Sequence, residues 1–132
     1  MAVIKATVHF GEGFQGELVT VRDARVPIGP GAGKASPYDL LLGALASCYY
    51  ATFLDIAEKK RLAFGSARVE VSGEKREQVP TTLAWVTVRL TIVKPASRAG
   101  FDQSAELAGK YCSIYQTLSH VAEMKTELAF EE

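Results

Sequence analysis

Cysteine is scarce in this sequence, with only Cys48 and Cys112 among 132 residues. Small secreted scaffolds held together by disulfides are far richer in cysteine, and structural zinc sites use close Cys or His pairs that are missing here. The sequence also has no glycine-rich phosphate loop followed by lysine and no histidine pair with metal-ligand spacing, so neither a nucleotide nor a metal site is predicted. In a reducing compartment, two distant cysteines are either inert or redox-active.

An excess of charge of either sign is absent as well. Lysine plus arginine and aspartate plus glutamate both number 15, and the longest run of like charge is the triplet at residues 59–61. Nucleic acids and anionic membranes are therefore not expected as partners. The first nine residues lack the basic region and the continuous apolar stretch of a secretory signal, so we expect a cytoplasmic protein.

The length and the 48% hydrophobic content suit one domain over residues 1–132. Residues 3–9 alternate apolar and polar side chains, glycines follow, and residues 17–22 resume the pattern, which predicts an N-terminal hairpin. Residues 27–34 hold two prolines and three glycines, which predicts a loop leading into the site.

A long helix is predicted over residues 37–60. Ser36 suits the N-cap, Pro37 the first helical position, and Asp39 the third residue after the cap. Residues 40–54 are apolar on almost every side, yet the run is shorter than the roughly 20 residues that span a bilayer. We expect a buried core helix that one sheet cannot cover alone, and a second copy of the chain is the simplest cover.

The remaining patterns complete an α+β chain. Residues 68–77 and 83–93 alternate as strands joined through residues 78–81, and residues 124–130 alternate as a last strand. Residues 101–111 and 112–122 have helical spacing.

This order of elements resembles the OsmC/Ohr family from end to end, and two motifs carry the resemblance. Residues 36–48 read Ser-Pro-Tyr-Asp-Leu-Leu-Leu-Gly-Ala-Leu-Ala-Ser-Cys, which is similar to the family's Asn-Pro-Glu-x-Leu-x-x-Ala-x-x-Ala-x-Cys. Residues 111–114 read Tyr-Cys-Ser-Ile and resemble its second cysteine motif. Either motif alone is weak, but both in this order and at this spacing are specific.

The resemblance implies an OsmC-like swapped homodimer, with antiparallel sheets wrapped around two long central helices. It also implies a reaction in which Cys48 attacks the distal oxygen of an organic hydroperoxide and becomes a sulfenic acid. That acid condenses with Cys112 to a disulfide, which a dithiol such as lipoamide reduces. No bound cofactor or metal is implied.

Activation of the thiol is the main requirement of this chemistry. Cys48 lies about three turns into its helix, where the helix dipole is weak, and a free thiol has a pKa of about 8.5 that burial raises. A basic partner is therefore expected. The family uses an N-terminal arginine, for which Arg25 is the better candidate and Arg22 the alternative. Otherwise both arginines are surface residues and Cys48 is a packing residue.

The first turn of the long helix departs from the family pattern. Tyr38 stands where peroxidase members have the glutamate that orients the arginine, and Asp39 follows one position later. One position rotates a side chain by about 100°, so Asp39 either orients the arginine or only caps the helix. Tyr38 either offers its hydroxyl to the site or packs. A serine follows Cys112 where many relatives have proline, which keeps the thiol.

Aromatic residues around both cysteines suggest a substrate pocket. Tyr49, Tyr111 and Tyr115, with Tyr38, are expected to wall an apolar pocket for a hydroperoxide, although the same residues suit a dimer core. The leading hypothesis is a thiol-dependent hydroperoxide reductase. The alternative is an OsmC-like module that binds a small apolar ligand without peroxidase activity, which the missing glutamate favours. A redox sensor has no DNA-binding helix or basic face to support it.

Overall fold

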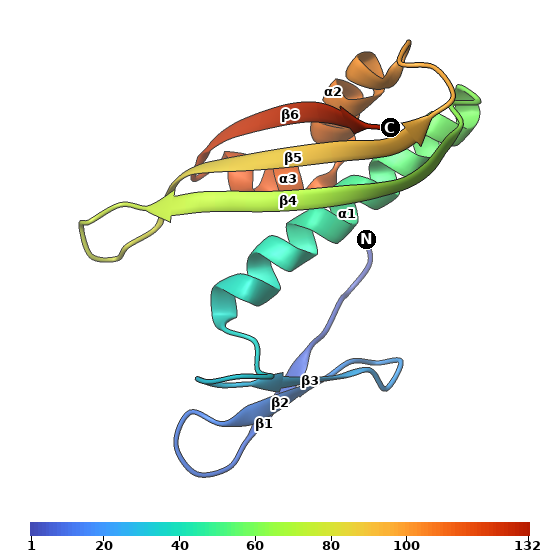
Figure 1. The fold of residues 1–132 in the computed structure, drawn as a ribbon. Coiled ribbons are helices and arrows are strands. Elements are labelled where there is room, and N and C mark those ends of the chain that lie inside the picture. The colour runs from blue at the N-terminus through green and yellow to red at the C-terminus, as the bar shows by residue number, and fades with distance from the viewer. The chain divides into compact units, whose positions relative to one another are not determined.

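The computed structural model describes residues 1–132 and has the expected α+β composition (Figure 1). In chain order the elements are β1 (Thr7–Phe10), β2 (Gly16–Val19), β3 (Arg25–Ile28), α1 (Pro37–Lys59), β4 (Phe64–Lys75), β5 (Leu83–Pro95), α2 (Phe101–Tyr111), α3 (Ser113–Ser119) and β6 (Glu123–Glu131). The chain divides into two compact units, Met1–Leu41 and Leu42–Glu132, and the boundary falls inside α1. Each unit is described by itself.

The N-terminal unit contains a three-stranded antiparallel sheet in the order β1-β2-β3, where a two-stranded hairpin was expected. The prediction of a loop from residue 27 is wrong for Pro27 and Ile28, which belong to β3. Proline is tolerated there because β3 is an edge strand, where a missing backbone donor costs few ladder bonds.

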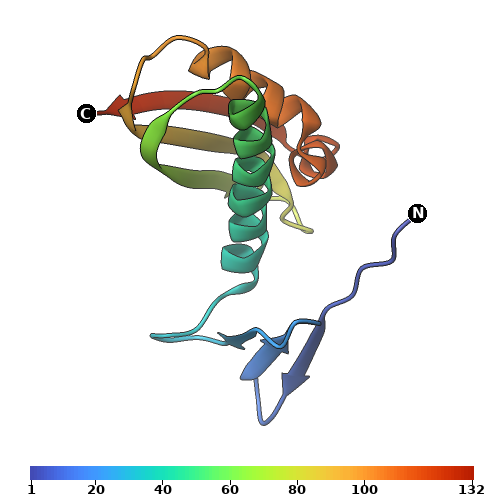
Figure 2. The same ribbon diagram turned by 90° about the vertical axis from the view of Figure 1, so that its right-hand side faces the viewer.

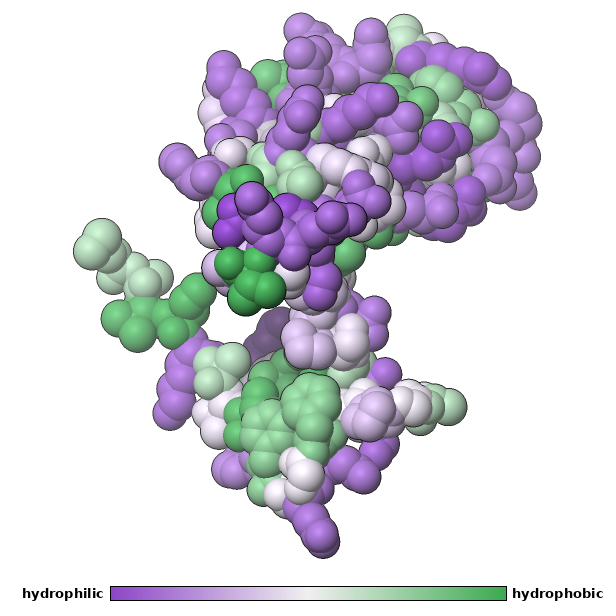
Figure 3. Space-filling view, turned by 90° about the vertical axis from the view of Figure 1, so that its left-hand side faces the viewer, coloured by the Kyte–Doolittle hydropathy of each residue, from purple (hydrophilic) through white to green (hydrophobic).

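Hydrophobic side chains gather on the surface of this unit (Figure 3), including the exposed Phe10 and Phe14.

Helix α1 begins and ends where the sequence predicts, within one residue. The backbone N–H of Ser36 donates to Asp39 Oδ2 at 2.8 Å, and the backbone N–H of Asp39 donates to Ser36 Oγ at 3.1 Å. This reciprocal pair is a capping box with aspartate in the acidic position, and it satisfies two donors that a helix start leaves open. The backbone N–H of Ser36 and, to a smaller extent, the Ser36 side chain lower the pKa of Asp39 by hydrogen bonding to its carboxylate.

Within the single chain, α1 is buried along one side only, as expected for a helix that one sheet cannot cover alone. Its buried residues Leu45, Tyr49, Phe53 and Ala57 follow one another at four-residue spacing and form a single stripe. The most apolar 18-residue window has a mean hydropathy of 1.6 and is only 22% buried, so α1 could cross a membrane by length and composition alone. Core helices of other proteins meet the same criterion, and coverage of α1 by a second copy stays a prediction.

The second unit contains a sheet in the order β4-β5-β6, with α1, α2 and α3 on one of its faces (Figures 1 and 2). Strands β4 and β5 pair antiparallel, as expected. Strands β5 and β6 are parallel, from Trp85↔Glu123 to Val93↔Glu131, so the prediction of purely antiparallel sheets is wrong at this pair. Helices α2 and α3 form the long crossover connection that a parallel pair requires.

An aromatic cluster fixes α1 against this sheet. The ring of Phe101 lies 6.3 Å from Phe53 on α1, 5.9 Å from Phe64 on β4 and 5.8 Å from Phe130 on β6, between ring centroids. Phe53 and Phe101 are fully buried. Because Cys48 precedes Phe53 by five residues on one rigid helix, this cluster also sets the position of Cys48.

We expect Phe53→Ala to lower the free energy of unfolding by about 3–5 kcal/mol, because it removes a fully buried ring and leaves a cavity among three elements. Urea denaturation followed by circular dichroism measures this change. Glu106→Ala on the exposed side of α2 is the control and should stay within about 0.5 kcal/mol of the parent chain. A loss below about 1 kcal/mol for Phe53→Ala would contradict the assignment of this cluster as the core.

Candidate active site

The structure brings Cys48 and Cys112 together from positions 64 residues apart in sequence. Cys48 lies in the middle of α1, and Cys112 occupies the turn between α2 and α3. The thiol of Cys112 points at Cys48, with 3.2 Å between the two Sγ atoms. Both are free thiols; Cys48 is half-buried, and Cys112 is fully buried. Of the predicted site residues, these two form the closest contact.

The backbone conformation at Cys112 directs its sulfur toward Cys48. The residue has an extended backbone (φ −74°, ψ 118°), which ends α2 and makes Cys112 the N-cap of α3. Its backbone N–H donates to Ala108 O at 2.9 Å, and its Sγ accepts from the backbone N–H of Tyr115 at 3.4 Å. Gln116 Nε2 donates to Gly109 O at 3.0 Å and ties the two helices together. The predicted helix at residues 112–122 is thus shorter, Ser113–Ser119.

Two tyrosines support this turn from within the core. Tyr49 is fully buried, and its hydroxyl donates to Ala105 O on α2 at 2.7 Å. The ring of Tyr115 lies 6.5 Å from that of Tyr49, between centroids. Gly109 leaves room for it, since a Cβ at Gly109 would stand 3.3 Å from Tyr115 Cζ. Full burial gives Tyr49 a packing position rather than an open pocket wall, and Tyr115 is half-buried behind Cys112.

Hydrogen bonds make the two thiols unequal. Burial raises the pKa of Cys48, but the backbone N–H of Ile114, the thiol of Cys112, and the hydroxyl and N–H of Ser113 outweigh it, so the pKa lies below its ordinary value. Burial raises the pKa of Cys112, the Tyr115 N–H opposes this, and the nearby Cys48 sulfur raises it further. Cys48 is therefore the thiol that ionises first, and Cys112 keeps its proton.

The source of this effect differs from the expected one. Within Leu42–Glu132, the groups that lower the pKa of Cys48 are hydrogen-bond donors, and none is a lysine or arginine. Donors at a turn far along the chain leave no mark near Cys48 in the sequence. Burial raises the pKa of Tyr49 and Tyr115, so both remain neutral neighbours of the thiol pair.

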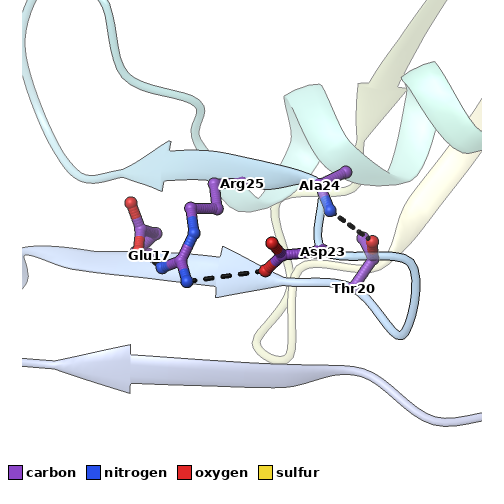
Figure 4. A network of polar contacts seen from close by, with 5 residues as sticks. All are labelled: Glu17, Thr20, Asp23, Ala24 and Arg25. Atoms are coloured by element: carbon purple, nitrogen blue, oxygen red, sulfur yellow. Dashed lines mark hydrogen bonds and ion pairs between the residues drawn. The ribbon is translucent and has the colours of Figure 1, made fainter.

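Arg25, the predicted thiolate partner, lies on β3 in the other unit. Its Nη1 is 2.7 Å from Glu17 Oε1 and its Nη2 is 3.5 Å from Asp23 Oδ1 (Figure 4). Both contacts are exposed, and surface ion pairs of this kind contribute at most about 1 kcal/mol, so they hold Arg25 weakly. Arg22 is exposed in the turn before β3. The pairing of either arginine with Cys48 stays a prediction.

Asp39 and Tyr38 belong to the first turn of α1. Asp39 acts as the acidic partner of the capping box, which is one of the two roles open to it from the sequence. Its second role, orienting an arginine, stays a prediction, as does a contribution of the half-buried Tyr38 to the site.

A groove of about 550 Å³ begins one helical turn beyond Cys48. Its lining residues are Ala51, Thr52, Asp55, Ile56, Lys59 and Tyr111. Thr52 Oγ1 donates to Cys48 O at 3.0 Å, and Tyr111 directly precedes Cys112, so neighbours of both cysteines line the groove, although neither cysteine is itself a lining residue. Among the tyrosines predicted to wall a pocket, Tyr111 lines this groove. The five α1 residues were missed, although their helical spacing places them on one face.

Comparisons with known proteins identify the family. The family model described as OsmC-like protein matches residues 29–127. The chain is similar to the OsmC-like protein of Mycoplasma pneumoniae (TM-score 0.86, 18% identity, 99% of each chain covered). It is also similar to an OsmC-like protein of unknown function from Vibrio cholerae (TM-score 0.84, 18% identity, 97% of this chain and 99% of that one).

An organic hydroperoxide resistance protein of Bacillus subtilis, OhrB, has the same fold (TM-score 0.67, 17% identity, 96% of this chain and 99% of that one). No curated protein matches the sequence. Identities this low establish the fold alone, whereas the family model covers most of the chain and includes Cys48 and Cys112. The chain therefore belongs to the OsmC-like protein family.

Proposed function

We propose that this chain is a thiol-dependent peroxidase that reduces organic hydroperoxides, with Cys48 as the attacking thiol and Cys112 as the resolving thiol. The contact that carries the proposal is the 3.2 Å approach of the Cys112 thiol to Cys48 Sγ. Several solved structures with this fold are named organic hydroperoxide resistance proteins, among them those of Legionella pneumophila and Bacillus subtilis.

In the first step the Cys48 thiolate attacks the distal oxygen of the hydroperoxide. The O–O bond breaks, and the alkoxide leaves and takes up a proton to become an alcohol. The sulfur becomes a sulfenic acid, so it loses the two electrons that the peroxide gains. The lowered pKa of Cys48 supports this role, because the thiolate is the nucleophilic form. Its partial exposure lets a substrate reach it.

In the second step the sulfur of Cys112 attacks the sulfenic acid, and water leaves as the disulfide forms. The two sulfurs stand 3.2 Å apart, so they approach by only about 1.2 Å to reach disulfide bonding distance. Cys112 keeps its proton until this step, and burial protects it from reacting with peroxide itself. An external dithiol such as lipoamide then reduces the disulfide by thiol–disulfide exchange.

The groove beside Cys48 is the proposed substrate site. Apolar atoms of Ala51, Ile56 and Tyr111 offer contacts to the organic group of a hydroperoxide, and Asp55 and Lys59 stand farther along α1. Tyr49 and Tyr115 pack in the core next to the turn that carries Cys112. Arg25, oriented by Asp39 or Tyr38, is proposed to stabilise the Cys48 thiolate further with its positive charge. Homodimer formation and a cytoplasmic location remain part of this proposal.

A second candidate function is an OsmC-like module that binds a small apolar ligand without peroxidase activity. Tyr38 in place of the acidic residue of the family motif favours it, because that acid is expected to orient the arginine. The carboxylate of Asp39, the nearest acid, is already bonded to Ser36 N–H. In this case the thiols would react with oxidants slowly and without preference for organic peroxides.

Site-resolved alkylation tests which thiol is the nucleophile. We expect iodoacetamide to modify Cys48 at a lower pH than Cys112, because the pKa of Cys48 is lowered and that of Cys112 is raised. The alkylation rate of each thiol rises as pH increases through its own pKa, so the Cys48 curve lies on the acidic side. Peptide mass spectrometry after short exposures measures both curves. Coincident or reversed curves would contradict the assigned roles.

Peroxide titration tests the reaction itself. One equivalent of cumene hydroperoxide added to the reduced protein should remove two thiols and lower the intact mass by about 2 Da, the change on forming one disulfide. Hydrogen peroxide should act more slowly, because it gains nothing from the apolar groove. Stopped-flow measurement of free thiols with intact mass spectrometry records both results.

Two variants separate the steps of this reaction. Cys48→Ser should abolish the fast phase, whereas Cys112→Ser should lose one thiol and gain about 16 Da as the sulfenic acid accumulates. If the thiols of the parent chain survive excess cumene hydroperoxide for many minutes, the peroxidase proposal fails and the ligand-binding module takes its place.

A further inference from the structure

A hydroxyl group shares the Cys48 sulfur with Cys112. Ser113 Oγ lies 3.8 Å from Cys48 Sγ, within hydrogen-bonding reach of a sulfur atom, and this is the one hydrogen-bonding contact of the Ser113 side chain. Ser113 is the first residue of α3, so its backbone is fixed by the turn that also aims Cys112. The side chains of Cys112 and Ser113, which are adjacent in sequence, therefore both contact the sulfur of Cys48 on α1.

We propose that Ser113 is a catalytic residue that donates its hydroxyl hydrogen to the Cys48 thiolate and holds it as the attacking sulfur. A thiolate has no hydrogen to donate, so in the contact with Ser113 the hydroxyl must be the donor. Hydrogen bonds to charged acceptors are stronger than those between neutral groups, so the contact tightens when Cys48 ionises. This inference rests on the proposed role of Cys48 as the attacking thiol.

A division of labour between Ser113 and Cys112 follows. The thiol of Cys112 also donates to Cys48, but it must turn from donor to nucleophile once Cys48 is oxidised. A hydroxyl is far less acidic than a thiol and is not consumed in the cycle, so Ser113 can stabilise the thiolate at the start of every turnover. The lowering of the Cys48 pKa by the Ser113 hydroxyl agrees with this geometry.

Other titratable groups near Cys48 also influence its pKa, so their influence has to be distinguished from that of the Ser113 hydroxyl. Cys112 contacts it directly, and Tyr49 and Tyr115 lie behind with raised pKa values and stay neutral while Cys48 titrates. Arg25, the predicted cationic partner, belongs to the N-terminal unit. A change confined to Ser113 leaves all four unchanged, so differences among Ser113 variants report the hydroxyl.

Three substitutions at Ser113 and one control test the proposal. Ser113→Ala removes the hydroxyl and should move the pH midpoint of Cys48 alkylation upward by about 0.5 to 1, with about three- to tenfold less thiolate below that midpoint. Ser113→Thr keeps the hydroxyl and should restore the parent midpoint. Ser113→Pro removes the hydroxyl and the backbone donor while suiting a first helical position, and should shift the midpoint at least as far.

Ser119→Ala is the matched control, since it removes a serine hydroxyl from the same helix, one that donates to Gln116 O instead. It should leave the midpoint unchanged. An unchanged midpoint in Ser113→Ala, or equal shifts in Ser113→Ala and Ser113→Thr, would overturn the role of the hydroxyl.

Peroxide consumption by the same proteins distinguishes this failure from that of the proposed function. If Ser113→Ala shifts the midpoint but the parent chain does not reduce cumene hydroperoxide, the hydrogen bond from Ser113 to the Cys48 thiolate stands, and the peroxidase proposal and the catalytic role of Ser113 fail. If the parent chain reduces the peroxide and the midpoint does not move, only the role of Ser113 is lost.

Discussion

The contact between the Cys112 thiol and the Cys48 sulfur is the interaction on which the site depends. It joins the middle of α1 to the turn between α2 and α3, and both sides are held by buried structure. Phe53 and its aromatic partners fix α1 against the sheet, while Tyr49 bonds α1 to α2 through Ala105 O. A sulfur pair at 3.2 Å needs this rigidity, because a small displacement would remove the hydrogen bond and the short path to a disulfide.

The same turn gives the two thiols different chemistry. The chain turns at Cys112, and the backbone N–H groups of Ser113 and Ile114 and the Ser113 hydroxyl donate to Cys48, while Cys112 itself is fully buried. One sulfur thus gains donors and partial access to solvent, and the other loses solvent and keeps its proton. In many reactive cysteines a nearby cation lowers the thiol pKa. Hydrogen-bond donors in a partly buried site also lower it.

Strong local signals explain what the sequence predicts well. Ser36, Pro37 and Asp39 mark the start of α1, and alternation marks β5 and β6, so these elements are placed to within two residues. Strand β3 was missed because Pro27 argues against a strand until the edge position is known. The parallel pairing of β5 with β6, the groove along α1 and the contact of Ser113 with Cys48 depend on tertiary placement, which local patterns do not contain.

The N-terminal unit connects the predicted dimer with the proposed chemistry. Among the hydrophobic residues of Met1–Leu41 only Ile28 is buried, and Phe10 and Phe14 are exposed by about half. A unit of this size cannot bury a core of its own, so its sheet needs an apolar surface to pack on. Helix α1 has unused apolar faces, in this copy of the chain and in any second one. Arg25 belongs to that sheet, so the predicted pairing of its guanidinium with Cys48 depends on the surface that the sheet packs on.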